Sequence, residues 1–331
     1  MSKKRESFCI ECRKYCEYEF KQVERKYVIK DKEYNMDVTV AFCKSCGSEI
    51  DVPGIMDYRA KEIDRQYREK EEIVSIDEIR KLMEIYNMGK APLSLALGFG
   101  EITITRYLQG QVPSKEYSAI MKHALESPSY MVELLNNHRD KIGDVAFNKA
   151  IKATDELVFF MKSSDNLIST ISYVFEKSKE ITPLALQKIL YYAQGIYMAI
   201  YKEPLYREDC VAWAHGPVYD SVYDIFKTFK YNPIDDDRYM IFKNKYKRLG
   251  EKEREIIDLV LDTFGMYSGK MLECITHKET PWIQARDGYY PSERSNVVIE
   301  KDSIKKYFEK LEESYDIRTA EGISVYIREK I

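Results

Sequence analysis

The sequence has 331 residues, 44% of them hydrophobic, and carries a formal net charge of −3 at pH 7. This length allows two or three packed domains, and the nearly balanced charge excludes a chain-wide polyanion-binding surface while permitting a local one. The N-terminus leads into cysteines rather than an apolar leader, and no run of about 18 apolar residues occurs, so we expect a cytoplasmic protein without membrane contact.

Cysteines are concentrated near the N-terminus, where five of the seven precede residue 47. Four of them form two CxxC pairs separated by 30 residues, Cys9 with Cys12 and Cys43 with Cys46. Two such turns can converge on one tetrahedral ion, and thiolates favour zinc, so we predict one structural zinc bound by these four residues. Four protein ligands leave no position for water, which disfavours zinc hydrolysis. Cys16 is a spare thiol and an alternate ligand.

The residues between and after the two pairs predict a small zinc ribbon and a helix. Residues 27–42 alternate apolar and polar side chains, with Val38, Val40 and Phe42 on one face, as expected for strands of the ribbon. Residues 56–72 are mostly charged and predict a solvated helical connector. We therefore assign residues 1–72 to a zinc ribbon and its connector.

Residues 90–110 predict two short helices joined by a glycine turn. Gly98 permits the left-handed residue that ends the first helix, and Gly100 opens the second. Ile104 and Tyr107 can then pack inward against the first helix. This leaves a set of outward residues that we expect to contact operator DNA: Glu101, Ile102, Thr103, Thr105 and Arg106.

Together with a backing helix at residues 76–86, this motif predicts a helix-turn-helix DNA-binding domain over residues 73–135. Residues 73–133 hold six basic and seven acidic side chains, so no basic stripe marks a phosphate-binding face. We therefore expect weak non-specific DNA affinity and operator binding that depends on a homodimer.

The order of these motifs resembles the MqsA (YgiT-like) antitoxins over residues 7–125: CxxC, a long gap, CxxC, a charged connector, and a helix-turn-helix ending in RYLQG. In that family the four cysteines bind structural zinc, and the DNA-reading helix uses an Asn and an Arg. The resemblance implies that Arg106 contacts a base, whereas the Asn position falls on Ile102. Isoleucine can meet a thymine methyl group but cannot pair bidentately with adenine, so we expect a different operator sequence.

The remaining sequence predicts a helical bridge at residues 136–165 and a C-terminal domain at residues 166–331. Thr182 as N-cap and Pro183 in the first turn begin a long apolar helix, which we expect at the centre of the domain. Residues 213–217 are expected to end a strand and turn into a helix that begins at Pro217. The predicted fold is mainly α, with a β-containing zinc ribbon, a helix-turn-helix domain, and a helical C-terminal domain with a few short strands.

Two stretches of the C-terminal half, residues 186–226 and 276–288, resemble the Panacea domain (SocA-like antitoxin) family. The resemblance extends over about residues 166–315 and implies a mainly helical module that neutralises a protein toxin encoded beside it, by binding rather than catalysis. A few aromatic anchors usually dominate such an interface. We expect exposed tyrosines to supply them here: Tyr192, Tyr219 and Tyr223.

The leading interpretation is the antitoxin of a type II toxin–antitoxin system, which sequesters a cognate toxin and represses its own operon. One alternative is a transcription regulator or proteolytic adaptor, of phage or mobile-element origin, without a cognate toxin. A second is an enzyme, since His215 and His277 lie near Asp220 and Glu279. The sequence has no nucleophile elbow, Gly-rich phosphate loop or His–carboxylate spacing for a catalytic metal, so we expect no enzyme and no small-molecule substrate.

Overall fold

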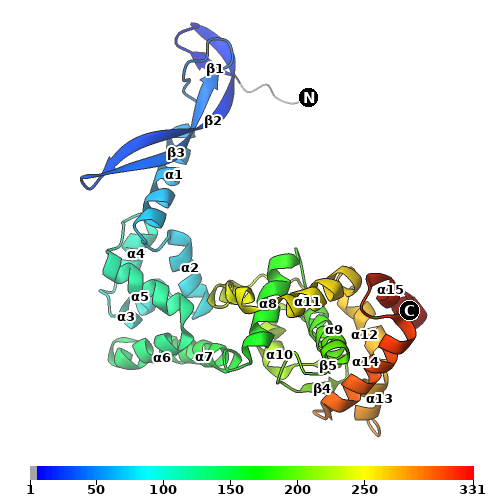
Figure 1. Cartoon of the computed structure of the whole chain (residues 1–331). Helices are drawn as coiled ribbons and strands as arrows, with labels where there is room; N and C mark the ends of the chain where they lie inside the picture. Colours follow the sequence, from blue (N-terminus) through cyan, green and yellow to red (C-terminus); the bar gives the residue numbers. More distant parts are fainter. Residues whose placement is uncertain (1–5) are drawn as a thin grey trace.

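The computed structural model of the chain describes residues 6–331 and is mainly helical, which confirms the predicted fold class. An arm of three strands and one helix rises from a group of short helices, and the C-terminal helices lie beside that group (Figure 1). In the described part of the chain, no helix combines the length and apolar character needed to cross a membrane.

The arm begins with an antiparallel sheet in the order β1-β2-β3, formed by β1 (Glu6–Cys9), β2 (Lys14–Ile29) and β3 (Lys32–Cys43). The long β2–β3 hairpin pairs from Tyr18↔Cys43 to Ile29↔Lys32. Its two turn residues, Lys30 and Asp31, both have positive φ, of 49° and 64°. Such a turn matches the right-handed twist of the flanking strands and so keeps the hairpin in register.

Helix α1 (Ile55–Lys70) lies along the edge of β3 that β2 leaves unpaired. The carboxylate of Glu62 accepts the Thr39 N–H at 2.8 Å, and the Gln66 amide both accepts the Asp37 N–H at 3.0 Å and donates to the Asp37 carbonyl at 2.7 Å. Side chains of the helix therefore take the place of a further strand along the free edge of β3. The connector is helical, as predicted. The expectation that it is solvated is wrong for the side of α1 that contacts β3.

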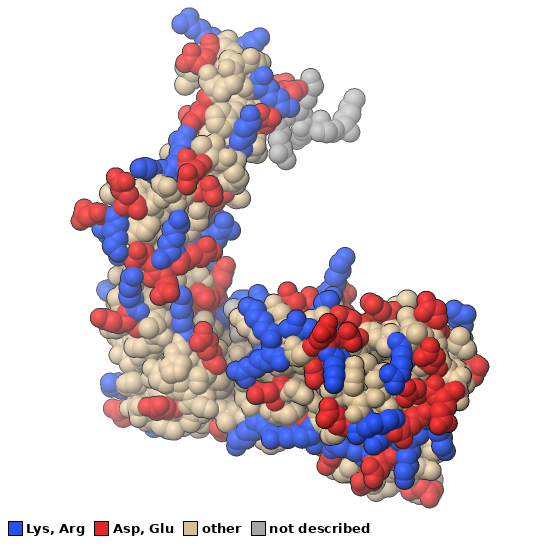
Figure 2. All heavy atoms as spheres, viewed as in Figure 1, with Lys and Arg blue, Asp and Glu red and all other residues tan. Residues whose placement is uncertain are grey.

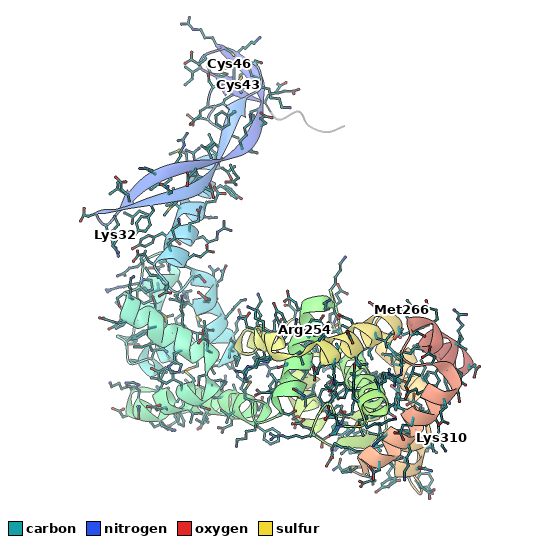
Figure 3. All side chains as sticks on the ribbon, in the orientation of Figure 1. Lys32, Cys43, Cys46, Arg254, Met266 and Lys310 are labelled. Atoms are coloured by element: carbon teal, nitrogen blue, oxygen red, sulfur yellow. The ribbon has the colours of Figure 1, made fainter. Side chains whose placement is uncertain are left out.

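Glu71, directly after α1, joins the arm to the helices that follow. Its carboxylate accepts from Tyr34 of β3 at 2.9 Å and pairs with Lys115, the first residue of α5, at 2.8 Å. Lys32 at the tip of the β2–β3 hairpin, labelled in Figure 3, lies 3.4 Å away. The ammonium group of Lys115 lowers the pKa of Glu71 to about 2. This carboxylate therefore stays ionised at neutral pH.

The next group contains five helices whose apolar faces meet in one core. A capping box begins the first of them, because Ser75 and Glu78 each accept from the other's backbone N–H. Gly98 has a φ of 78°, as predicted for the residue that ends the next helix. The helices are α2 (Ile76–Ile85), α3 (Lys90–Ala96), α4 (Thr103–Leu108), α5 (Lys115–Glu126) and α6 (Pro128–Asn137).

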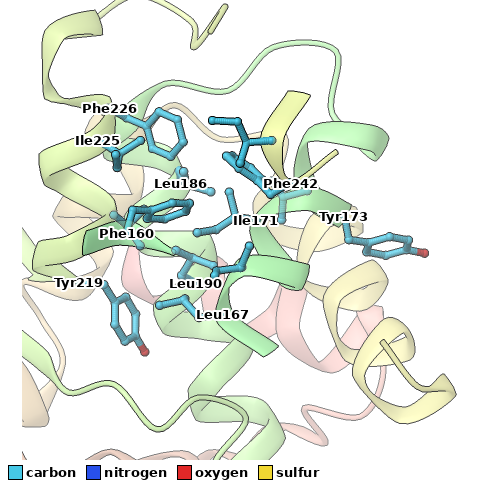
Figure 4. Packing of buried hydrophobic residues seen from close by; sticks show 14 of the residues in the cluster. Phe160, Leu167, Ile171, Tyr173, Leu186, Leu190, Tyr219, Ile225, Phe226 and Phe242 are labelled. Carbon is cyan, nitrogen blue, oxygen red and sulfur yellow. The ribbon is translucent and has the colours of Figure 1, made fainter. Parts of the chain in front are cut away.

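The segment predicted as a bridge forms a 3-10 turn (Arg139–Lys141) and helix α7 (Asp144–Phe160), which packs against α6 and against α10 of the C-terminal part. Buried apolar residues form one continuous cluster from Val74 to Ile327. Figure 4 shows part of it, where Phe160 of α7 meets Phe226 and Phe242. The bridge helix α7 therefore packs against helices that precede it and helices that follow it in the chain.

The C-terminal part is built around α9 (Pro183–Tyr201), which is buried along most of its length. Thr182 caps it and Pro183 occupies its first turn, as predicted. Its neighbours are α8 (Asp165–Lys177), α11 (Glu251–Phe264), α12 (Gly269–Thr276) and α14 (Lys301–Tyr315). The last helix, α15 (Ala320–Lys330), packs on α11 and α14.

A small second sheet has the order β5-β4-β6, with β4 (Cys210–Trp213), β5 (Gly216–Val218) and β6 (Val298–Ile299). The prediction of a helix from Pro217 is wrong. Trp213 pairs with Gly216 across a hairpin, and Pro217 lies in an edge strand, where its missing N–H costs no ladder bond. The helix begins three residues later, at Asp220. The remaining helical elements are α10 (Asp220–Phe226), α13 (Thr280–Ala285) and three 3-10 turns (Lys227–Phe229, Asp237–Ile241 and Lys245–Arg248).

Candidate metal centre and binding surfaces

The two CxxC pairs come together at the far end of the arm (Figure 3). Cys9 ends β1 and Cys43 ends β3, and each strand continues into a tight turn that returns the second cysteine of the pair. All four sulfur atoms lie within 4.8 Å of one another. The Sγ atoms of Cys9 and Cys46 are 3.5 Å apart, and those of Cys12 and Cys43 are 4.0 Å apart.

These distances fit one tetrahedral ion, since thiolates about 2.3 Å from zinc lie about 3.8 Å from each other. Local hydrogen bonds favour the thiolate, which is the form that binds metal, at one cysteine of the second pair: the Cys46 N–H, followed by that of Ser45, lowers the pKa of Cys43 to about 6. In the first pair, contacts with the other thiols, that of Cys46 foremost, raise the pKa of Cys12. The four residues are therefore compatible with one structural metal ion such as zinc. Cys16 is buried beside the cluster but lies outside the group of four.

The expected DNA-contacting residues lie on one exposed stretch at the start of α4. Ile104 and Tyr107 are buried, as predicted, and Glu101, Ile102 and Arg106 are exposed. The helix begins at Thr103 rather than at Gly100, so Glu101 and Ile102 belong to the turn. The expected DNA-contacting residues therefore come partly from the turn before α4 and partly from the first residues of α4. Two of them, Thr103 and Thr105, are half-buried. Basic and acidic side chains intermingle over α1–α6 on the face in Figure 2.

Two of the three tyrosines proposed as partner contacts are in the core. Tyr192 is fully buried, stacks on Phe264 at 3.8 Å, and donates to Glu279 at 2.9 Å. Tyr219 is 1% exposed and packs edge-on against Tyr206. The expectation that Tyr192 and Tyr219 are exposed is therefore wrong, because helices and the β4–β5 hairpin cover α9 on several sides. Tyr223 is half-buried and borders a surface pocket.

Two ionisable side chains of the C-terminal part, Glu279 and Lys188, are fully buried. Glu279 accepts hydrogen bonds from Tyr192 and from Tyr326 of α15, and burial raises its pKa to about 7. Lys188 donates to the Pro217 carbonyl at 3.0 Å, and burial lowers its pKa to about 8. A Cβ at Gly216 would lie 2.7 Å from the Lys188 ammonium nitrogen, so only glycine leaves room for this lysine.

The acid–base arrangement considered for the two histidines is not assembled. His215 has an exposed side chain, and its nearest carboxylate is that of Glu273, at 3.4 Å. His277 stacks on Trp282 at 4.0 Å. Within residues 6–331, neither histidine hydrogen-bonds to Asp220 or Glu279.

The pocket beside Tyr223 has a volume of about 610 Å³ and opens between the β4–β5 hairpin and the loop before β6. Its lining includes Trp213, His215, Tyr223, Arg294, Ser295 and Asn296. Sequence reasoning missed Trp213 and Arg294 as site residues. Trp213 lies in a stretch that resembles the Panacea family, so it could have been proposed, whereas Arg294 lies in a loop without periodicity.

Comparison with known proteins supports the C-terminal resemblance. A family model described as "Antitoxin SocA-like, Panacea domain" matches residues 186–283. This range runs from α9 into α13 and covers less than half of the chain, and it includes Trp213, His215 and Tyr223 but not Arg294. No curated protein and no solved structure matches the chain. The resemblance of the N-terminal half to MqsA-like antitoxins stays a prediction.

The buried Glu279 predicts a pH-dependent stability. Its pKa is raised to about 7 from an ordinary value of 4.5, so its protonated form stabilises the fold fully below about pH 4.5, and this contribution is lost as pH rises through about 7. Between about pH 5 and pH 8, the free energy of unfolding of the wild type should fall by up to about 3 kcal/mol relative to Glu279→Gln. Chemical denaturation at several pH values measures this difference.

Glu313→Gln, at an exposed position on α14, is the matched control and should follow the wild-type profile. Parallel pH profiles for the wild type and Glu279→Gln would contradict the assignment.

Proposed function

We propose that the chain is the antitoxin of a type II toxin–antitoxin system, which binds a protein toxin encoded beside it and blocks its action. The observation that carries this proposal is the match of residues 186–283 to the SocA-like antitoxin domain. A helical domain with a preformed aromatic pocket suits the binding of a partner. The proposed antitoxin acts by occlusion of the toxin.

The N-terminal half supplies a second proposed activity, repression of the operon that encodes both proteins. Helices α3 and α4, joined by the turn at Gly98, form a helix-turn-helix whose outward set would enter the major groove: Glu101, Ile102, Thr103, Thr105 and Arg106. Operator recognition would use a homodimer, because residues 73–133 hold six basic side chains against seven acidic ones and so offer few phosphate contacts in one copy. The zinc ion that we propose at the four cysteines stabilises the arm and takes no part in chemistry.

The metal assignment predicts one zinc ion per chain. Cys43→Ser should release the ion and unfold mainly the sheet of the arm, because among the described residues the core around the four cysteines has few other buried members: Cys16, Ala41 and Ile50. Elemental analysis of the purified chain measures the ion, and hydrogen exchange locates the unfolding. Cys16→Ser is the control and should keep the metal, since its sulfur lies outside the group of four. Full zinc content in Cys43→Ser would contradict the assignment.

If α4 is the DNA-contacting helix of the helix-turn-helix, Arg106 should contact bases of the operator. Arg106→Ala should weaken binding to a duplex from upstream of the gene by about 1–3 kcal/mol and relax its sequence preference, as expected for loss of an arginine–guanine contact. Fluorescence anisotropy with specific and scrambled duplexes measures both. Arg328→Ala on α15, an exposed site distant in sequence, controls for charge. Equal affinity and equal preference for Arg106→Ala would show that another element reads DNA.

The antitoxin assignment predicts rescue of growth in cells that express the small protein encoded by the adjacent reading frame. Co-expression of the full chain should restore growth, and the Arg106→Ala chain should restore it equally, since occlusion does not need DNA contacts. A chain that represses the promoter but leaves growth inhibited would be a regulator instead, and the antitoxin proposal would fail.

A further inference from the structure

The pocket at the β4–β5 hairpin has an aromatic wall from two different elements. Trp213 at the end of β4 and Tyr223 on α10 meet edge to face, with ring centroids 4.7 Å apart. Both rings belong to the stretch that matches the antitoxin family model. Trp and Tyr in a pocket are the side chains that most often dominate protein–protein binding, because they bury large areas with few rotatable bonds.

The opposite wall is held in place by the nearly buried Arg286, which is 6% exposed. Its guanidinium donates to the carbonyl of Ala212 at 3.1 Å, and to those of Tyr290 at 2.7 Å and Glu293 at 2.9 Å. These bonds fasten the loop before β6 to strand β4. The pocket is therefore formed before any partner arrives, and little loop ordering opposes binding.

The charge around the pocket favours an anionic partner group. Arg294 is exposed and makes no ion pair or hydrogen bond with another residue of the described chain. The other basic group on the rim, His215, contacts the buried Glu273, whose charge Lys270 already pairs at 2.6 Å. None of the described residues that line the pocket is acidic. A carboxylate would fit, because guanidinium binds it through paired hydrogen bonds.

An exposed aromatic side chain lies close in sequence to the residues that line the pocket. Tyr290, two residues before the lining residue Ser292, is 78% exposed, and its carbonyl accepts from Arg286. A pocket of about 610 Å³ can hold one or two side chains, and Tyr290 would be available to the segment that carries them. This extended surface suits a protein segment better than a small molecule, which a pocket would mostly enclose.

We propose that this pocket is the place where the toxin docks, through an aromatic or aliphatic side chain that enters between Trp213 and the loop, next to an Asp or Glu that pairs with Arg294. The proposal rests on the proposed antitoxin function and names the toxin-binding surface. It replaces Tyr192 and Tyr219, which are buried, and retains Tyr223 from the tyrosines expected to contact the partner.

The test uses the full chain and the purified protein encoded by the adjacent reading frame, with affinity measured by titration calorimetry. Arg294→Glu should weaken binding at least tenfold, since it places a carboxylate against the carboxylate of the toxin. Lys247→Glu, which makes the same charge change at an exposed site on a different loop, should bind like the wild type. Tyr223→Phe should bind nearly as well as the wild type, and Tyr223→Ala at least tenfold more weakly.

The outcomes separate the two proposals. If the wild-type chain does not bind the adjacent protein, the antitoxin function fails and the pocket proposal fails with it. If the wild type binds and both Arg294→Glu and Tyr223→Ala bind equally well, the function stands and the pocket proposal is overturned. Circular dichroism of each variant confirms that the fold is retained, and Arg294→Glu keeps the test decisive because its side chain makes no contact that the fold needs.

Discussion

The C-terminal part of the chain depends on polar side chains of the buried helix α9 that hydrogen-bond to the backbone of residues 206–219. Gln194 accepts the Tyr206 N–H at 2.8 Å and donates to the Tyr206 carbonyl at 3.1 Å, and Gln187 makes the same two bonds with Tyr219, at 2.8 and 3.3 Å. Lys188 adds a bond to Pro217 between them. A buried side-chain amide without a hydrogen-bond partner would destabilise the fold. Helix α9 can therefore be buried only when the β4–β5 hairpin lies where it supplies these partners.

The same constraint links the core to the proposed binding surface. The hairpin carries Trp213, and its carbonyls at Ala212 and Trp213 accept from Arg286 and from the Trp282 indole, at 3.1 and 2.9 Å. The hairpin is hydrogen-bonded to α9 through Pro217, and Arg286 links the loop before β6 to the hairpin. Both of these walls of the pocket are therefore connected to α9 by hydrogen bonds. The arm follows a related rule, since side chains of α1 pair with the free backbone edge of β3. In both places, helix side chains hydrogen-bond to backbone groups of a neighbouring strand or hairpin and fix its position against the helix.

Local pattern predicted the helices whose apolar spacing is regular. The N-cap Thr182 and the backing helix expected at residues 76–86 appear where the local pattern places them. The spacing of the CxxC pairs likewise predicted which four sulfurs converge. These features depend on residues close in sequence, or on a ligand geometry that spacing alone defines.

Other features depend on contacts distant in sequence and could not be predicted. The period of α9 indicates one apolar face, but α10, α11, α12 and α14 surround it, so Tyr192 is buried although it lies off that face. Pro217 looked like a helix start because its strand partner, Ala212, is known only from the fold. Glu62 looked solvated because its partner, the Thr39 N–H, belongs to a strand edge. Arg294 became a site residue only through the fold around its loop.

Binding of a protein toxin by the helical domain is tested by a calorimetric titration of the purified full chain with the purified protein from the adjacent reading frame. We expect a saturable complex with a Kd below about 1 µM, together with loss of the toxin's activity at the stoichiometric point. Absence of heat and of complex formation at concentrations well above that Kd, with both proteins folded, would contradict it.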